Sequence, residues 1–145
     1  MEKVIFDWVG TLYQFDGKGL FPFSEEVLRR LSQRYKLAVI SKAVSGNVET
    51  RRQQIRDLEH YFEFIVADTE KTQEQFIECI QRLNVRPQET LVVDDRADRG
   101  IQIGNRLGCQ TAWIRQGKYS DKMPDKETGE PTYRINSVED LLVIL

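Results

Sequence analysis

Residues 4–12 read VIFDWVGTL, and this stretch decides the fold. Residues 4–6 are apolar and partly β-branched, which predicts a short buried strand that ends at the carboxylate of Asp7. Ligands of parallel α/β sheets collect at the carboxyl ends of the strands, so a carboxylate at this point indicates a functional site. Two residues further on, Val9 has no group that can donate or accept a proton. That valine limits the chemistry that the sequence predicts.

Apolar runs alternate with helical patterns along the rest of the chain. Further strands are predicted at 37–40, 62–66, 90–93, 111–114 and 133–135, and helices at 24–35, 44–58, 72–84, 101–107 and 137–145. Thr72 and Gln75 form a capping-box pattern at the start of one helix, and Gly108 is placed to end another. This alternation predicts an α/β fold, a three-layer α/β/α sandwich around a parallel Rossmann-like sheet, as a single domain over residues 1–145.

Composition excludes several classes of protein. The 145 residues carry a net charge of −2, which gives no electrostatic reason to expect nucleic-acid or membrane-surface binding. No apolar run approaches the roughly 18–20 residues that span a bilayer, so we expect a cytoplasmic protein. His60 is the only histidine, which argues against Ser-His-Asp catalysis and multi-histidine metal sites. Cys79 and Cys109 have no metal-binding spacing and are expected in the core.

Polar side chains of particular kinds follow four of the predicted strands. Ser41 and Lys42 end the second strand, and Asp94 and Asp95 follow the fourth. Lys71 precedes the helix that comes after the third strand. Together with Asp7, these groups would meet at one edge of a parallel sheet. Carboxylates that can attack phosphorus and hold Mg²⁺, beside a cation and a hydroxyl, suit phosphoryl transfer.

At these positions the chain resembles the haloacid dehalogenase-like (HAD) hydrolase superfamily. The four matching segments, in chain order, are D7-W8-V9-G10-T11-L12, LAVIS ending at Ser41, EKTQEQF with Lys71, and TLVVDDRADRGIQIG with Asp94 and Asp95. The resemblance implies that Asp7 is a nucleophile. It further implies two sets of binding residues: for Mg²⁺, Asp7, the Val9 backbone carbonyl, Asp95 and Asp94; for phosphate, Ser41, Lys42, Lys71 and Thr11.

The chain departs from the superfamily pattern in its first motif. Phosphatases of the superfamily have a second aspartate where Val9 stands, and it protonates the leaving oxygen and later activates water. Phosphonoacetaldehyde hydrolases, with Asp-Trp-Ala-Gly-Thr, and haloacid dehalogenases proper lack that aspartate but rely on an inserted cap domain. Between Leu12 and Leu37 there is room only for a flap and one helix, so we expect no cap domain and neither of those two chemistries.

The fourth motif departs as well. Asp94 stands where the superfamily usually has glycine, and Arg99 and Gly100 stand where a further aspartate is usual. Asp94 and Asp95 are therefore the expected pair of metal ligands, with Asp98 as the alternative. A two-component receiver domain has its acid pair after the first strand instead, which argues against that class.

These observations predict a Mg²⁺-dependent phosphatase with an aspartate nucleophile and weak activity on alkyl phosphates. The alternative is a non-catalytic module of the same fold that binds a phosphate or a partner. Without a cap, either the phosphorylated substrate is large, even macromolecular, or a neighbouring subunit of a homo-oligomer covers the site. Residues 116–132 form the one long irregular stretch, and we expect them to flank the site edge or a subunit contact.

Overall fold

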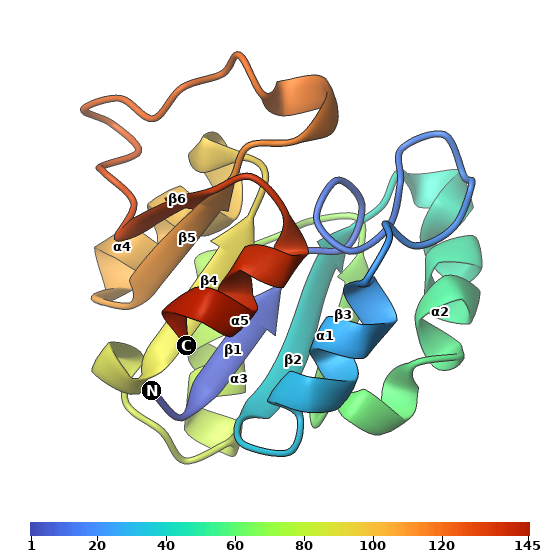
Figure 1. Ribbon diagram of the computed structural model, residues 1–145, viewed down its shortest axis with the longest axis horizontal. Helices are drawn as coiled ribbons and strands as arrows, with labels where there is room; N and C mark the ends of the chain where they lie inside the picture. Colours follow the sequence, from blue (N-terminus) through green and yellow to red (C-terminus); the bar gives the residue numbers. More distant parts are fainter.

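Six parallel strands form one sheet in the computed structural model, which describes residues 1–145 (Figure 1). The strand order is β3-β2-β1-β4-β5-β6. Their bounds are β1 Lys3–Phe6, β2 Lys36–Lys42, β3 Phe64–Asp68, β4 Thr90–Asp94, β5 Gln110–Ile114 and β6 Tyr133–Ile135. The order of the strands along the sheet reverses between β1 and β4, which makes their carboxyl ends the topological switch point. The predicted Rossmann-like parallel fold is confirmed.

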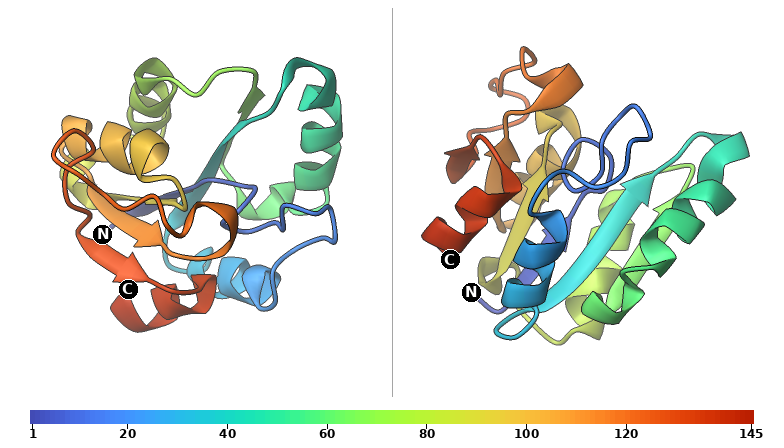
Figure 2. Two further views of the ribbon diagram at one scale, coloured as in Figure 1. Left: turned by 90° about the horizontal axis from the view of Figure 1, so that it is seen from above. Right: turned by 45° about the vertical axis from the view of Figure 1, so that its right-hand side comes forward.

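Helices cover both faces of the sheet (Figures 1 and 2). The α-helices are α1 Ser24–Leu31, α2 Val48–Arg56, α3 Gln73–Arg82, α4 Gln102–Leu107 and α5 Leu141–Ile144. Single turns join them: η1 Ser45–Asn47, η2 Glu59–Tyr61, η3 Pro87–Glu89, η4 Ala97–Ile101, η5 Gly117–Tyr119 and η6 Val138–Asp140. Residues of α1, α2 and α5 pack on one face of the sheet and residues of α3 pack on the other, which gives the three-layer arrangement.

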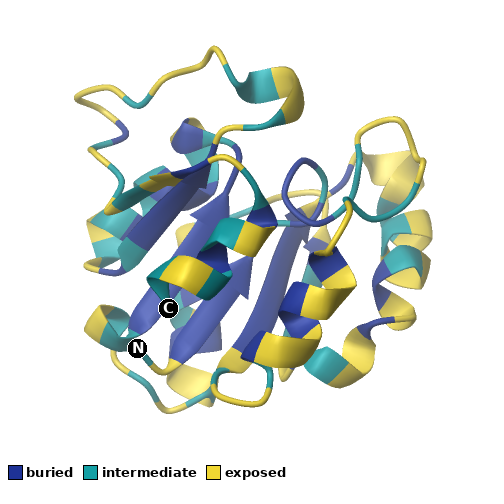
Figure 3. Cartoon of the chain, viewed as in Figure 1, coloured by how far each residue is buried: buried dark blue, intermediate teal, exposed yellow.

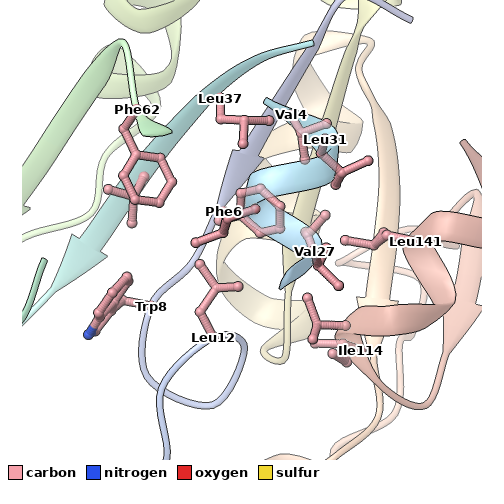
Figure 4. Close-up of a cluster of buried hydrophobic side chains, with 14 of the residues drawn as sticks. Val4, Phe6, Trp8, Leu12, Val27, Leu31, Leu37, Phe62, Ile114 and Leu141 are labelled. Carbon is pink, nitrogen blue, oxygen red and sulfur yellow. The ribbon is translucent and has the colours of Figure 1, made fainter. Parts of the chain in front are cut away.

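The core lies on both sides of β1, because successive side chains of a strand point to opposite faces. Val4 and Phe6 join the larger cluster with Leu28 and Leu141, part of which Figure 4 shows. Ile5 joins a second cluster beneath α3. Figure 3 shows the consequence, a buried sheet and helices that are exposed only on their outer sides. Cys79 and Cys109 are both free and buried in the second cluster, as predicted.

Several helices are shorter than their apolar patterns predict. The first ends at Leu31, where the backbone N–H groups of Arg34 and Tyr35 both donate to its carbonyl and turn the chain toward β2. Lys36 must begin β2 there because it pairs with Lys3. The predicted helix 44–58 is likewise reduced to η1 and α2. Two predicted helix ends are confirmed: the Thr72–Gln75 capping box, and Gly108, which ends α4 with φ of 84°.

No separate domain interrupts the sheet near its switch point. A flap loop over residues 7–23 and α1 connect β1 to β2, and η1, α2 and η2 connect β2 to β3. The expected absence of an inserted cap at these two places therefore matches the structure. No helix has the length and apolar character needed to cross a membrane.

Candidate active site

Three carboxylates meet where β1 and β4 end. Asp7 follows β1, Asp94 is the last residue of β4, and Asp95 follows it. One oxygen of each lies within 4.8 Å of one oxygen of each of the others. The backbone N–H of Asp7 donates to the carbonyl of Val93 at 3.0 Å, so the pairing of the two strands fixes this approach. Like charges this close repel, and the cluster therefore needs positive charge.

Lys71 supplies part of that charge. Its ammonium donates to Asp7 Oδ1 and to Asp94 Oδ2, both at 3.0 Å, and its side chain is only 3% exposed. Burial alone would lower the pKa of Lys71, but the two carboxylates outweigh burial and raise it. Burial and the charge of Asp94 raise the pKa of Asp7 despite Lys71. Lys71 is therefore a fixed cation that holds two of the three carboxylates in place.

Asp94 is the most completely hydrogen-bonded of the three carboxylates. Besides Lys71, it accepts hydrogen bonds from the backbone N–H groups of Arg96 at 3.0 Å and Gly100 at 2.8 Å. Burial acts to raise the pKa of Asp94, but Lys71 and the Arg96 N–H outweigh it and lower the pKa. Residues 97–101, which follow these contacts, form a wide π-type turn. Position 100 requires a glycine, because a Cβ atom there would overlap the Asp94 carboxylate. Asp94 thus anchors Lys71 and the start of the next helix.

Asp95 has the opposite character. Its Oδ2 atom is buried and has no hydrogen-bond partner, and a Cβ atom on Gly10 would overlap it. Burial and the charges of Asp7 and Asp94 raise the pKa of Asp95 to about 10. The backbone carbonyl of Val9 accepts no hydrogen bond either. Two unpaired oxygens beside Asp7 match the all-oxygen donor set that Mg²⁺ prefers, so these residues fit a divalent cation.

The end of β2 brings a second set of groups to the site. Ser41 is 1% exposed, and its hydroxyl accepts a hydrogen bond from Arg51 Nη1 at 2.5 Å. The same Nη1 donates to the Lys42 carbonyl at 2.9 Å. The Lys42 side chain is exposed and lines the cavity beside Asp7, as does Arg51. We call Lys42 and Arg51 the β2 wall.

Residues of the flap loop orient the end of β1. Thr11 is fully buried, and its hydroxyl donates to Asp7 Oδ2 at 3.2 Å. Trp8 is also fully buried, stacks on Tyr13 and donates from Nε1 to Gln54 on α2 at 3.2 Å. Val9 is half-buried and lines the cavity. The two carboxylate oxygens of Asp7 thus have different donors: Oδ1 accepts from Lys71 and Oδ2 accepts from Thr11.

The opposite side of the cavity comes from the turns after β4 and β5. Arg96 and Arg99 follow β4, and Lys118 and Tyr119 lie in η5 after β5; together they form what we call the distal wall. The Arg96 guanidinium lies 4.2 Å from the centre of the Tyr119 ring and pairs with Asp98 at 2.8 Å. Asp98 therefore pairs with Arg96 and is outside the cluster of three carboxylates.

The irregular stretch after β5 is anchored across the flap. Gln116 Nε2 donates to the carbonyls of Gly10 and Thr11, both at 3.1 Å. Phe15 of the flap meets Tyr119 edge to face, with ring centres 5.7 Å apart. The resulting cavity holds about 470 Å³, within the size range of small-molecule sites. Part of the stretch 116–132 thus flanks the site edge, one of the two expected places.

Sequence reasoning missed the residues of both walls except Lys42. One signal was present for Arg51, because Arg51 and Arg52 interrupt the apolar stripe of the predicted helix 44–58. For Arg99 the one signal was its place in the fourth motif, where an aspartate is usual, and no comparable signal marks Lys118. Lys118 lies in a polar segment whose path over the sheet depends on a distant anchor, the contact of Gln116 with the flap loop.

The family model for haloacid dehalogenase-like hydrolases matches residues 4–114, which include every residue of the carboxylate cluster and Lys71. The chain belongs to the haloacid dehalogenase-like hydrolases. Its sheet order and its uninterrupted connections from β1 to β2 and from β2 to β3 are those of a HAD core without an inserted cap at either place.

Part of this HAD core is similar to archaeal enzymes. The chain is 36% identical over 93 residues to glyceraldehyde 3-phosphate phosphatase of Methanopyrus kandleri, over 61% of this chain and 40% of that enzyme. It is 38% identical over 66 residues to the enzyme of the same name from Methanocaldococcus jannaschii, over 46% of this chain and 28% of that enzyme. The similarity thus spans less than half of either archaeal enzyme.

Solved structures of HAD proteins extend the match over nearly the whole chain. A HAD phosphatase from Thermococcus onnurineus has a TM-score of 0.77 at 18% identity, covering 99% of this chain and 97% of that one. L-2-haloacid dehalogenase from Xanthobacter autotrophicus has a TM-score of 0.78 at 11% identity, covering 99% and 98%. YfnB of Bacillus subtilis, with bound magnesium, has a TM-score of 0.72 at 25% identity, covering 90% and 57%. The first two likenesses establish the fold.

Proposed function

We propose that this HAD core is a Mg²⁺-dependent phosphatase that hydrolyses phosphate monoesters with Asp7 as the nucleophile. The observation that carries the proposal is the double contact of Lys71 with Asp7 and Asp94, beside the unpartnered oxygen of Asp95. Lys71 holds the Asp7 carboxylate at the cavity, and the unpartnered oxygen of Asp95 beside it can bind a cation. The names of the archaeal relatives support a phosphorylated substrate.

In this proposal the reaction has two steps. A carboxylate oxygen of Asp7 attacks phosphorus, the bond from phosphorus to the ester oxygen breaks, and the leaving oxygen takes a proton from water. Water then attacks the phosphorus of the aspartyl phosphate, which releases inorganic phosphate and restores Asp7. Thr11 and Lys71 orient the Asp7 carboxylate. The Ser41 hydroxyl, the Lys71 ammonium and the β2 wall bind the phosphoryl oxygens.

Asp7, Asp95 and the Val9 carbonyl would hold the Mg²⁺, with Asp94 next to them in the same cluster. When bound, the metal would neutralise negative charge on the phosphoryl oxygens. Asp94 already accepts three hydrogen bonds, so its part is to keep Lys71 and the π-type turn in position. The magnesium in YfnB, at 25% identity, supports the choice of metal.

Val9 sets the limits of this activity. No other carboxylate takes the place of the missing general acid, because Asp7 is the only acidic residue of the flap loop that lines the cavity and position 9 is a valine. General acid–base help is typically worth about 10²–10⁴-fold in rate. Esters with good leaving groups need that help least, so aryl phosphates should be hydrolysed faster than alkyl phosphates.

The test is hydrolysis of p-nitrophenyl phosphate with Mg²⁺ and with a chelator. Turnover that needs Mg²⁺ and disappears in Asp7→Asn is the expected result. Calorimetric titration with Mg²⁺ should show binding that Asp95→Ala removes, and Asp98→Ala is the matched control because Asp98 lies outside the cluster. Binding that Asp95→Ala leaves unchanged would contradict the proposed metal site.

A second candidate is a non-catalytic module that binds a phosphate or a partner, and Val9 is the observation that favours it. The same assays separate the two. Mg²⁺ binding in calorimetry together with no turnover of any phosphate ester would support the module. Turnover that Asp7→Asn abolishes would exclude it.

A further inference from the structure

The cavity beside Asp7 carries more positive charge than the chain as a whole. The full sequence has a net charge of −2, yet five cationic side chains line this one cavity: Lys42, Arg51, Arg96, Arg99 and Lys118. The only acidic side chains that line it are the three of the carboxylate cluster. Like charges gathered in one cleft repel one another and focus the local potential toward anions.

Most of these cations have no carboxylate partner within the chain. Arg96 pairs with Asp98, but Lys42, Arg51, Arg99 and Lys118 form no ion pair with any carboxylate. Other exposed arginines of the chain, such as Arg29 and Arg82, pair with a glutamate on their own helix. The cavity thus gathers four cations without a carboxylate partner around one small space.

The unpaired cations stand on two sides of Asp7. In the sheet, β1 lies between β2 and β4, and β5 lies beyond β4. Lys42 and Arg51 belong to β2 and the helix after it, whereas Arg99 and Lys118 follow β4 and β5. Figures 1 and 2 agree, because the orange turn around residue 118 and α2 lie on different sides of the end of β1.

Only one of these sides is needed for the phosphoryl group that Asp7 attacks. Arg51 is bound to Ser41, which places the β2 wall next to the proposed phosphate-binding hydroxyl. The distal wall has no such link, and there the Tyr119 ring meets Phe15 between the flap and η5. A substrate with its phosphate on the β2 wall would pass the aromatic rings and reach Arg99 and Lys118.

We infer that the substrate is a small phosphate monoester with a second anionic group, a carboxylate or another phosphate, which Arg99 and Lys118 bind. This inference rests on the proposed function, since it assigns the substrate class of the same site. The cavity volume of about 470 Å³ suits a small molecule. The inferred substrate also differs from the one in the name of the archaeal relatives, because glyceraldehyde 3-phosphate has one anionic group only.

The test compares substrates that differ only in the second anion. One pair is 3-phosphoglycerate and glyceraldehyde 3-phosphate, and the other is fructose 1,6-bisphosphate and fructose 6-phosphate. We expect kcat/KM to favour the member with two anionic groups in at least one pair by about tenfold or more, as a charge-assisted contact predicts. The preferred pair tells whether the second group is a carboxylate or a phosphate.

Substitutions in the distal wall test whether Arg99 and Lys118 cause the preference for a second anionic group. Arg99→Gln and Lys118→Gln should each reduce the ratio of the two kcat/KM values roughly tenfold. Lys122→Gln is the matched control, because its ammonium also lies 5.6 Å from the centre of the Tyr119 ring but does not line the cavity. The control should leave the ratio unchanged. A ratio that all three variants leave unchanged overturns the assignment.

A binding measurement separates this inference from the proposed function. Calorimetry on Asp7→Asn protein with Mg²⁺ should give a lower Kd for 3-phosphoglycerate than for glycerol 3-phosphate, or for the bisphosphate than for the monophosphate. If wild-type protein shows no turnover but this preference holds and Arg99→Gln removes it, the inference stands and the phosphatase proposal fails. Equal Kd values within both pairs, or no binding of any of these ligands, would overturn the inference even if p-nitrophenyl phosphate is hydrolysed.

Discussion

The strand ends at the switch point and the two walls of the cavity hold charge in different ways. At the strand ends, Asp7 and Asp94 share one buried cation and all four of their carboxylate oxygens accept hydrogen bonds, whereas Asp95 Oδ2 is buried without a partner. On the walls, four cations are unpaired, although the chain has more acidic than basic residues. The first arrangement determines geometry and stability, and the second is suited to binding an anion from solution. Substitutions in the two regions should therefore have different effects.

The largest effect is expected for Lys71→Met at the strand ends. It leaves two buried carboxylates without their cation, and breaking a buried pair in this way typically costs about 3–5 kcal/mol of unfolding free energy. Urea denaturation measures the loss, and phosphatase activity should be lost with it. Lys42→Met, which removes an exposed cation of the same cavity, should change stability by less than about 0.5 kcal/mol. Equal stability of the two variants would remove the distinction between the regions.

Val9→Asp should produce the next largest effect, a gain in activity. It restores a group that can protonate the leaving oxygen and activate water, which is worth at most about 10²–10⁴-fold on alkyl phosphates. Val9 lines the cavity and packs only partly buried against the edge of the larger core cluster, so a carboxylate can be accommodated on the cavity side. Steady-state kinetics should show a smaller gain on aryl phosphates. Folded, Mg²⁺-binding protein with no gain on any ester would favour the non-catalytic module.

Asp95→Asn should stabilise the protein in the absence of metal. The pKa of Asp95 in the folded state is about 10, far above the value of about 3.9 in unfolded chains, so the folded state binds more protons between these values. The free energy of unfolding consequently falls as the pH rises from about 4 toward 10. Asparagine removes that penalty, and we expect a gain of about 1–3 kcal/mol at pH 8 in a chelator.

Thermal unfolding at several pH values measures this gain. The difference between Asp95→Asn and wild-type protein should shrink steadily as the pH is lowered and vanish below about 3.9, where Asp95 is protonated in both the folded and the unfolded state. Mg²⁺ should raise the Tm of wild-type protein but not that of the variant. If the variant is less stable than wild type at pH 8 without metal, the unpartnered Asp95 Oδ2 does not lower the free energy of unfolding.

The sequence predicts the strand ends better than the walls, for a physical reason. Parallel strands end at the same edge, so the positions of Asp7, Asp94 and Ser41 follow from the order of the elements alone. The place of Lys118 depends on the path of the loop after β5. That path rests on contacts far apart in sequence, such as Gln116 with Gly10, and no local pattern encodes it.

The same reason explains the errors in the predicted helices. Apolar periodicity identifies which residues face the core, but the ends of the helices are decided by the sheet. The first helix stops at Leu31 because Lys36 must pair with Lys3, although Tyr35 continues the apolar stripe. The π-type turn at 97–101 follows from the hydrogen bonds of Asp94 to two backbone N–H groups, which the sequence does not reveal.

Arg51→Gln should have the smallest of these effects and is the most selective probe of a wall. Arg51 contacts only a hydroxyl and a carbonyl within the chain, so its loss should change the unfolding free energy by no more than about 1 kcal/mol. If its guanidinium binds the phosphoryl group, KM should rise about tenfold for every phosphate ester, with a smaller change in kcat.

Arg52→Gln provides the matched control for this prediction. Arg52 is the next residue on the same helix, pairs weakly with Glu49 at 3.8 Å and donates to the Ala67 carbonyl at 3.3 Å, but it does not line the cavity. Its loss should leave KM unchanged. Arg51→Lys keeps the charge without the forked donor, so an intermediate KM would show that geometry as well as charge is used. Equal KM values for the Arg51 and Arg52 variants would mean that Arg51 binds no phosphate, and Lys42, Ser41 and Lys71 would then be the phosphate-binding side chains that remain.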